Sequence, residues 1–113
     1  MELWQELEQK IKELDISVKN LRRSGTTFAN AERDYKILLR KKVLELRDEG
    51  TAVTLIPLIV YGIEEVAQAR STRDIAQAVY EANKEAINSL KLQIRVIQEQ
   101  NKQEWGVAQY DSQ

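Results

Sequence analysis

Three cations in this sequence have types and spacings suited to binding an anion. Arg33, Lys36 and Arg40 recur at intervals of three and four, which on a helix aligns their side chains along one face. Guanidinium groups hold phosphates through paired hydrogen bonds, so this row is a candidate phosphate site. A row of cations is also the ordinary solvated face of a helix, and the sequence leaves both interpretations open.

A second polar group lies within an otherwise apolar helical pattern. Arg73, Tyr80 and Asn83 occupy positions of that pattern among small residues. Polar residues at such positions often only set the register of paired helices. The alternative is a pocket between chains, in which Arg73 adds charge, Tyr80 stacks on a base and Asn83 bonds to its edge. The neighbouring small residues that would leave room for it are Ala69, Ala76, Ala78, Ala82 and Ala86.

The helix that must position this second group is expected over residues 63–104, which contain no proline or glycine. Residues spaced alternately three and four apart form one continuous seam, the pattern of helices that pack knobs into holes. Such a helix is roughly 60 Å long, so we expect its partner surface on another copy of the chain. The seam consists of Val66, Ala69, Arg73, Ala76, Tyr80, Asn83, Ile87, Leu90, Ile94, Ile97 and Asn101.

Three further helices are expected before it. A first helix over residues 2–23 should end at Ser24-Gly25-Thr26, and a second over residues 28–49 should end at Gly50. A short apolar helix over residues 54–61, with Pro57 in its first turn, should fold the chain back. The first two helices have the apolar seams Trp4, Leu7, Ile11, Leu14, Val18, Leu21 and Phe28, Ala31, Tyr35, Leu38 or Leu39, Val43, Leu46.

The expected fold is therefore all-α: a long-helix bundle or coiled coil of three long helices and one short helix, assembled as a homo-oligomer. Residues 1–104 should form a single helical domain, and residues 105–113 a flexible tail. The short helix should cover the end of the bundle through Leu55, Ile56, Leu58, Ile59 and Val60.

Charge is unevenly distributed along the 113 residues, although the net charge is only −1. Residues 19–47 contain nine basic and three acidic residues, a net charge of +6. Residues 1–18 contain two basic and five acidic residues, a net charge of −3. Charged residues make up 31% of the chain and aromatic residues only 6%, which is typical of long solvated helices.

Histidine and cysteine are both absent, which excludes disulfides, cysteine nucleophiles, zinc sites built from these residues and imidazole catalysis. No glycine-rich phosphate loop or nucleophile elbow replaces them. We therefore expect no enzyme activity, no cofactor and no metal site. The N-terminus lacks the pattern of a signal peptide, and the longest apolar run, residues 55–61, is far too short to span a membrane. A cytoplasmic protein without membrane partners is expected.

The stretch around residues 50–62 resembles a helix-turn-helix motif, but its sequence disfavours binding of a helix in the DNA major groove. The would-be recognition helix begins Ile63-Glu64-Glu65, which places two acids where phosphates would lie. That helix also continues for some forty residues. A corner between helices is the better interpretation.

The chain resembles a group of small helical proteins, mostly uncharacterised, from prophages of Gram-positive bacteria. The resemblance covers nearly everything before Trp105 and is carried by three stretches, none of them a motif with known chemistry. It implies an accessory protein of a phage or integrated element. The stretches are AERDYKILLRKKVLELRDEG (31–50), TAVTLIPLIVYG (51–62) and YEANKEAINSLKLQIRVI (80–97).

Three functions follow as hypotheses. The first is a sponge: a non-enzymatic phage protein that sequesters an anionic, nucleotide-derived immune signal in pockets of a homo-oligomer, with Arg33, Lys36 and Arg40 on its phosphates. The second is an accessory nucleic-acid-binding factor in phage single-strand recombination or replication, for which stacking aromatic residues are scarce. The third is a structural coiled coil, or one that inhibits a host protein.

Overall fold

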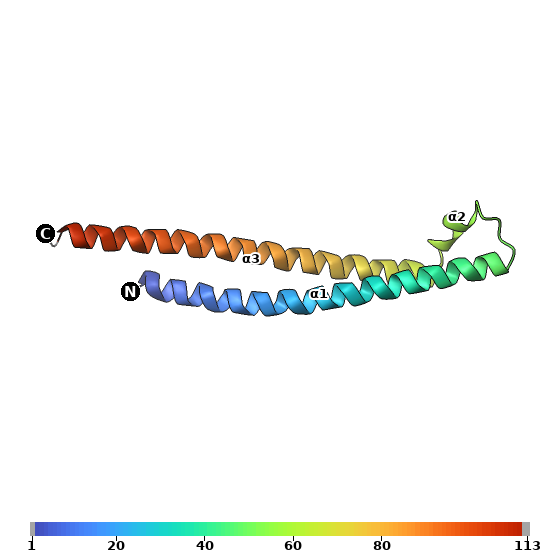
Figure 1. The fold of residues 1–113 in the computed structure, drawn as a ribbon, viewed down its shortest axis with the longest axis horizontal. Coiled ribbons are helices and arrows are strands. Elements are labelled where there is room, and N and C mark those ends of the chain that lie inside the picture. Colours follow the sequence, from blue (N-terminus) through green and yellow to red (C-terminus); the bar gives the residue numbers. More distant parts are fainter. Residues whose placement is uncertain (1, 112–113) are drawn as a thin grey trace. The chain divides into compact units, whose positions relative to one another are not determined.

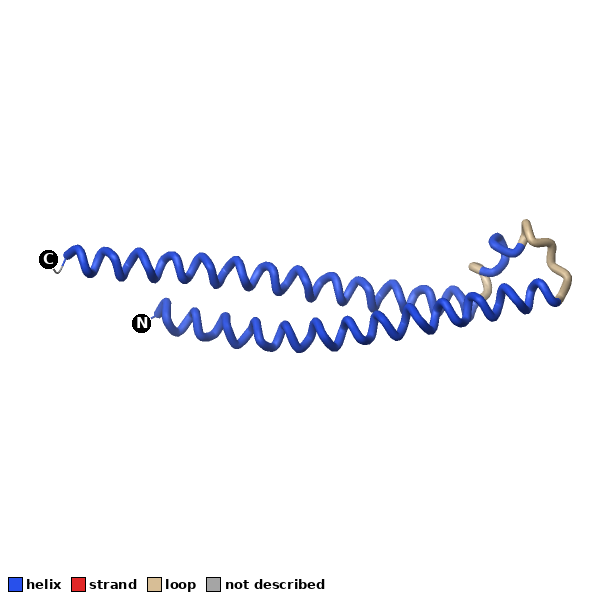
Figure 2. The backbone as a smooth tube through the Cα atoms, in the orientation of Figure 1, coloured by secondary structure: helices blue, strands red, loops and turns tan. Residues whose placement is uncertain are grey.

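A computed structural model describes the backbone of residues 2–111 and the side chains of residues 2–106. The described chain is almost entirely helical and contains no strand, which confirms the all-α class. Two long helices, α1 (Glu2–Asp48) and α3 (Glu64–Asp111), are joined through the short helix α2 (Ile56–Val60) (Figures 1 and 2). The described residues therefore contain two long helices, and not the expected three.

The expected break at Ser24-Gly25-Thr26 is wrong, because α1 runs through it without interruption. Gly25 has no positive φ, and the Thr27 hydroxyl donates a hydrogen bond to the Arg23 carbonyl oxygen at 3.0 Å, a bond made inside a helix. Ser24 is buried, at a position of the seam. Tertiary packing thus outweighs the roughly 1 kcal/mol by which glycine disfavours a helix relative to alanine.

The end of α1 has a different glycine geometry. Gly50 adopts φ = +87°, its N–H donates to the Arg47 carbonyl oxygen, and the Thr51 N–H donates to the Leu46 carbonyl oxygen, both at 3.0 Å. These two bonds form a Schellman motif, which satisfies carbonyl groups at the end of the helix. The expected stop at Gly50 is confirmed.

Two compact units divide the chain. The terminal unit comprises Met1–Arg22 and Ala82–Gln113, and the corner unit comprises Arg23–Glu81. In each unit a segment of α1 lies antiparallel to a segment of α3 (Figure 1). Whether the two units together form the single domain expected over residues 1–104 is a separate question. The single domain stays a prediction.

The seam predicted for α3 is confirmed by burial. Every member from Val66 to Ile97 is buried or half-buried, and only Asn101 is exposed. Within each unit this seam faces a segment of α1 of the same chain, so its periodicity does not by itself require a second copy. The expected homo-oligomer stays a prediction.

The seam of α1 has a different phase from the one expected near its start. Trp4 and Ile11 are 55% and 44% exposed, whereas the polar residues Lys10 and Ser17 are half-buried. The polar residues in this phase are the reason that the apolar pattern alone predicts a different seam. One unbroken repeat of buried and half-buried residues runs through Leu3, Leu7, Lys10, Leu14, Ser17, Leu21, Ser24, Phe28, Ala31, Tyr35, Leu38, Lys42 and Glu45.

The core of the corner unit centres on three buried residues, Tyr35 of α1, Val60 of α2 and Val66 of α3. Helix α2 begins with a proline in its first turn, as expected, and buries Ile56 and Val60. The three other apolar residues expected to cover the bundle end are exposed, because a single short helix turns only one side inward. They are Leu55, Leu58 and Ile59.

Helix α3 continues to Asp111, past its expected end at residue 104. Residues 112–113 of the predicted flexible tail lie outside the described residues. Within residues 2–111, no helix combines the length and apolar character needed to cross a membrane.

Candidate anion-binding face

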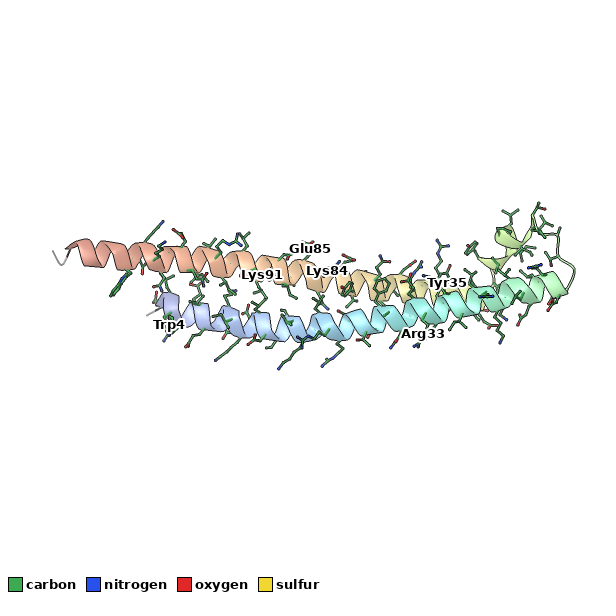
Figure 3. All side chains as sticks on the ribbon, in the orientation of Figure 1. Trp4, Arg33, Tyr35, Lys84, Glu85 and Lys91 are labelled. Carbon is green, nitrogen blue, oxygen red and sulfur yellow. The ribbon has the colours of Figure 1, made fainter. Side chains whose placement is uncertain are left out.

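The predicted cation row lies on the side of α1 turned away from α3 in the corner unit. Arg33, Lys36 and Arg40 are exposed, and Figure 3 shows Arg33 pointing away from the facing helix. Arg47 continues the row, because Arg33, Arg40 and Arg47 are spaced seven residues apart, two helical turns each. We call these four residues and the exposed Lys41 the cationic face.

Nearby acids neutralise only part of the cationic face. Arg33 pairs with its neighbour Asp34 at 3.0 Å, and Lys36 lies 3.7 Å from Glu32. Both pairs are largely exposed, so each is worth well under about 1 kcal/mol. Arg40, Lys41 and Arg47 form no ion pair with any residue of the described chain. The cationic face therefore keeps a net positive charge.

Lys42, which the sequence places beside this row, belongs instead to the seam. Its ammonium group lies 3.2 Å from Glu45 of α1 and 3.5 Å from Glu65 of α3. The hydrogen bond to Glu45 raises the pKa of Lys42 above its ordinary 10.5, and the charges of both carboxylates act in the same direction against the opposing effect of partial burial. Lys42 is thus engaged in joining the helices.

Arg73 occupies the seam and already has three partners. Its guanidinium group lies 4.7 Å from the centre of the Tyr35 ring, 2.8 Å from Asp74 and 3.9 Å from Glu32. A guanidinium over an aromatic ring gains both cation–π attraction and dispersion. The structure thus supports the register-setting interpretation of Arg73, and an anion there would compete with two carboxylates.

Glu32 connects the two predicted groups, and the sequence analysis did not single it out. Its Oε1 atom lies within ion-pair distance of both Lys36 and Arg73. The signal was present in the spacing, because Glu32 precedes Lys36 by four residues on α1. Its reach to Arg73 depends on helix pairing, which spacing alone does not specify.

Tyr80 is half-buried against α1. Its ring lies 5.9 Å from the Phe28 ring, at an interplanar angle of 34°. A Cβ atom on Gly25 would lie only 3.2 Å from Cε1 of Tyr80, so the glycine makes room for the ring. Tyr80 therefore serves as a packing residue in the corner unit.

Asn83 belongs to the terminal unit. Its side-chain amide donates a hydrogen bond of 3.4 Å to the backbone carbonyl oxygen of Asn20. That bond ties the α1 and α3 segments of this unit together. The ligand-binding role predicted for Arg33, Lys36, Arg40, Arg73, Tyr80 and Asn83 stays a prediction.

An apolar groove lies between α1 and α2 in the corner unit, with a volume of about 480 Å³. The sequence did not predict it, because the groove depends on how α2 folds back. Arg47 of the cationic face is the charged residue among those that line it. The others are Leu39, Val43, Val53, Ile56, Pro57, Val60 and Tyr61.

Among the described residues, no group of three or more acidic side chains is arranged to hold a metal ion. Comparison of the chain with protein-family models, curated proteins and solved structures finds no match. The resemblance to prophage proteins therefore stays a prediction.

Proposed function

We propose that this protein is a non-enzymatic accessory protein that binds a polyanion, a nucleic acid, along its cationic face. One observation carries the proposal: Arg40, Lys41 and Arg47 are exposed without ion-pair partners in the described chain. Neutralising phosphates with such cations releases condensed counterions, which supplies most of the affinity of sequence-independent binding. An accessory role in replication or recombination of a phage or integrated element fits this chemistry.

The length of the cationic face favours a polymer over a small ligand. From Arg33 to Arg47 the helix rises roughly 21 Å, a distance that spans several phosphates of a nucleic-acid strand. A single nucleotide would contact only part of this row. Aromatic residues exposed beside the cations are scarce, so the proposed binding depends on phosphates and not on bases.

Sequestration of a nucleotide-derived immune signal between copies of the chain is the second candidate. What favours it is the half-buried Arg73, whose guanidinium group lies over the buried ring of Tyr35, with a second ring, that of Tyr80, two turns further along α3. A phosphate there would have to displace Glu32 or Asp74 from Arg73. If no anion binds, the remaining hypothesis is a coiled coil with a structural role or one that inhibits a host protein.

Salt-dependent binding tests the first candidate. Fluorescence anisotropy of a labelled 30-nucleotide single strand, repeated over a series of salt concentrations, should show affinity falling steeply as salt rises. The double variant R40A/K41A should reduce the magnitude of the log–log slope by about 1.4, roughly 0.7 for each cation lost from a single-strand contact. The matched control K91A/R95A removes two exposed cations from α3 in the terminal unit and should leave the slope unchanged. Equal effects of the two variants would reject the cationic face.

Native mass spectrometry tests the second candidate. The purified protein is measured alone and with a panel of cyclic and ADP-ribose-type nucleotides. One retained nucleotide per interface of a discrete oligomer, lost in Arg73→Ala, would establish the sponge. An oligomer that stays empty with every nucleotide would reject it.

A further inference from the structure

The groove between α1 and α2 is an apolar surface left open at the corner unit. Val60 and Ile56 are buried beneath it, whereas Val53 and Tyr61 on its edges are 74% and 46% exposed. Exposed apolar surface with a concave shape commonly marks an interaction site. The volume of about 480 Å³ is large enough for one aromatic side chain.

Charge restricts what the groove can receive. Arg47 lines it and has no ion-pair partner in the described chain, and Arg40 lies two turns earlier on the same side of α1. A matching partner offers a large apolar side chain with a carboxylate about one helical turn away.

The start of α1 has this combination. Trp4 is 55% exposed, Glu8 follows it by one turn on the same face, and the exposed Ile11 follows by two turns. Residues 1–18 carry a net charge of −3, opposite in sign to the cations beside the groove. Tryptophan is also the residue type most enriched among those that dominate binding energies.

The other tryptophan fits less well. Trp105 is 66% exposed, but Lys102 lies beside it, and residues 99–106 have a net charge of only −1. No second exposed apolar residue lies one or two turns before it on the same face. Charge and apolar pattern therefore both favour Trp4.

We propose that Trp4 of a second copy of this chain inserts into the groove between α1 and α2, with Glu8 of that copy pairing with Arg47. An indole buries about 150–250 Å² on insertion, which makes it the dominant anchor of such a contact. Each copy offers one Trp4 and one groove, so the contact either closes into a reciprocal pair or propagates along a chain of copies. The inference deepens the expected homo-oligomer and does not depend on polyanion binding.

Complementation between two deficient variants tests this contact. Trp4→Ala removes the inserted side chain, and Val53→Glu places a carboxylate at the groove edge, where it repels Glu8. Both positions are exposed, so circular dichroism should show the helical content of both variants unchanged. Sedimentation velocity should show that each variant alone self-associates more weakly than the native protein, on the order of thirtyfold.

The mixture of the two variants is the decisive sample. Trp4→Ala keeps an intact groove and Val53→Glu keeps an intact Trp4, so the mixture should associate more strongly than either variant alone. The matched control Trp105→Ala should associate like the native protein. In a Trp105→Phe background, the emission of Trp4 should shift to shorter wavelength as the protein concentration rises.

Three results would overturn the proposal: a native protein that stays monomeric up to millimolar concentration, native-like association of Trp4→Ala, or a mixture that associates no more strongly than its two components. Trp4→Ala should still bind the labelled single strand. This measurement shows whether the polyanion proposal holds even if the Trp4 contact does not exist. The binding should persist, because Trp4 lies outside the cationic face, and its salt slope should steepen by at most about 0.7, the share of the single cation Arg47 that loss of the Glu8 contact frees.

Discussion

At the scale of single residues, polar side chains in the seam have two kinds of role. Lys42 and Arg73 both reach across from one long helix to acids or rings of the other within the corner unit. The cations of the cationic face point outward, and three of them have no ion-pair partner in the described chain. Residues of the same charge thus divide between holding the helices in register and remaining available to a partner.

The pH dependence of stability should report the role of Lys42. A raised pKa in the folded state means that the stabilisation is fully present below about pH 10.5 and is lost as the pH rises through the raised value. The melting temperature of the native protein should therefore exceed that of Lys42→Gln at pH 8, and the difference should shrink towards pH 12. A difference that stays constant up to pH 12 would exclude this role.

At the scale of elements, the continuity of α1 through Gly25 rests on packing against α3. The glycine weakens the helix locally, but the absence of its side chain admits the Tyr80 ring. The seam residues Ser24 and Phe28 on either side of it keep their spacing. Helix propensity and tertiary packing oppose each other at this position, and packing decides the outcome.

A double-mutant cycle should measure this opposition. In a Tyr80→Ala background, Gly25→Ala should stabilise the protein by about 1 kcal/mol, the difference in helix propensity. In the native background the gain should be smaller or reversed, because the added methyl group lies too close to the ring. Urea denaturation of the four proteins gives the coupling free energy. A coupling of zero would show that Tyr80 does not contact this turn of α1.

The C-terminal end of α1 gives a second prediction at this scale. Gly50→Ala should destabilise the protein by about 1 kcal/mol, because a side chain disfavours the positive φ that the Schellman motif requires. Space is not the cause, since no atom beyond Gly50 and its two chain neighbours lies within 4 Å of the added methyl group. Gly50→Asn should cost less, because asparagine tolerates this conformation better. The midpoint of urea denaturation measures both, and equal destabilisation by alanine and asparagine would argue against a backbone origin.

At the scale of the whole molecule, the chain consists of two compact units, each with its own buried residues. Leu7, Ile87, Leu90 and Ile97 are buried in the terminal unit, and the cluster around Val66 is buried in the corner unit. Local stability should therefore differ between the units.

Hydrogen exchange should resolve the two units. Leu90→Ala removes a buried side chain of the terminal unit, a change that typically costs about 2–5 kcal/mol. Amide exchange should accelerate in the α1 and α3 segments of the terminal unit and stay unchanged in residues 28–48 and 64–76. Val66→Ala should produce the opposite pattern. Uniform acceleration in both variants would show that the whole chain unfolds as one cooperative unit.

The sequence by itself determined the all-α class, the seam of α3, the corner at Pro57 and the stop at Gly50. These features follow from local rules: the periodicity of apolar residues, the fixed φ of proline and the freedom of glycine at positive φ. The exposed position of Arg33, Lys36 and Arg40 also follows from spacing once α1 is known to be a helix.

Only the tertiary structure decided the continuity of α1, the phase of its first seam, the partners of Arg73 and the groove beside α2. Each depends on a contact between residues that are distant in sequence. Gly25 lies against the Tyr80 ring, Glu32 pairs with Arg73, and Val60 packs with Tyr35 and Val66. Local propensity differs by at most about 1 kcal/mol per residue at such positions, apart from proline. Packing between helices contributes more than that, so contacts across the pair and not the sequence pattern decided these features.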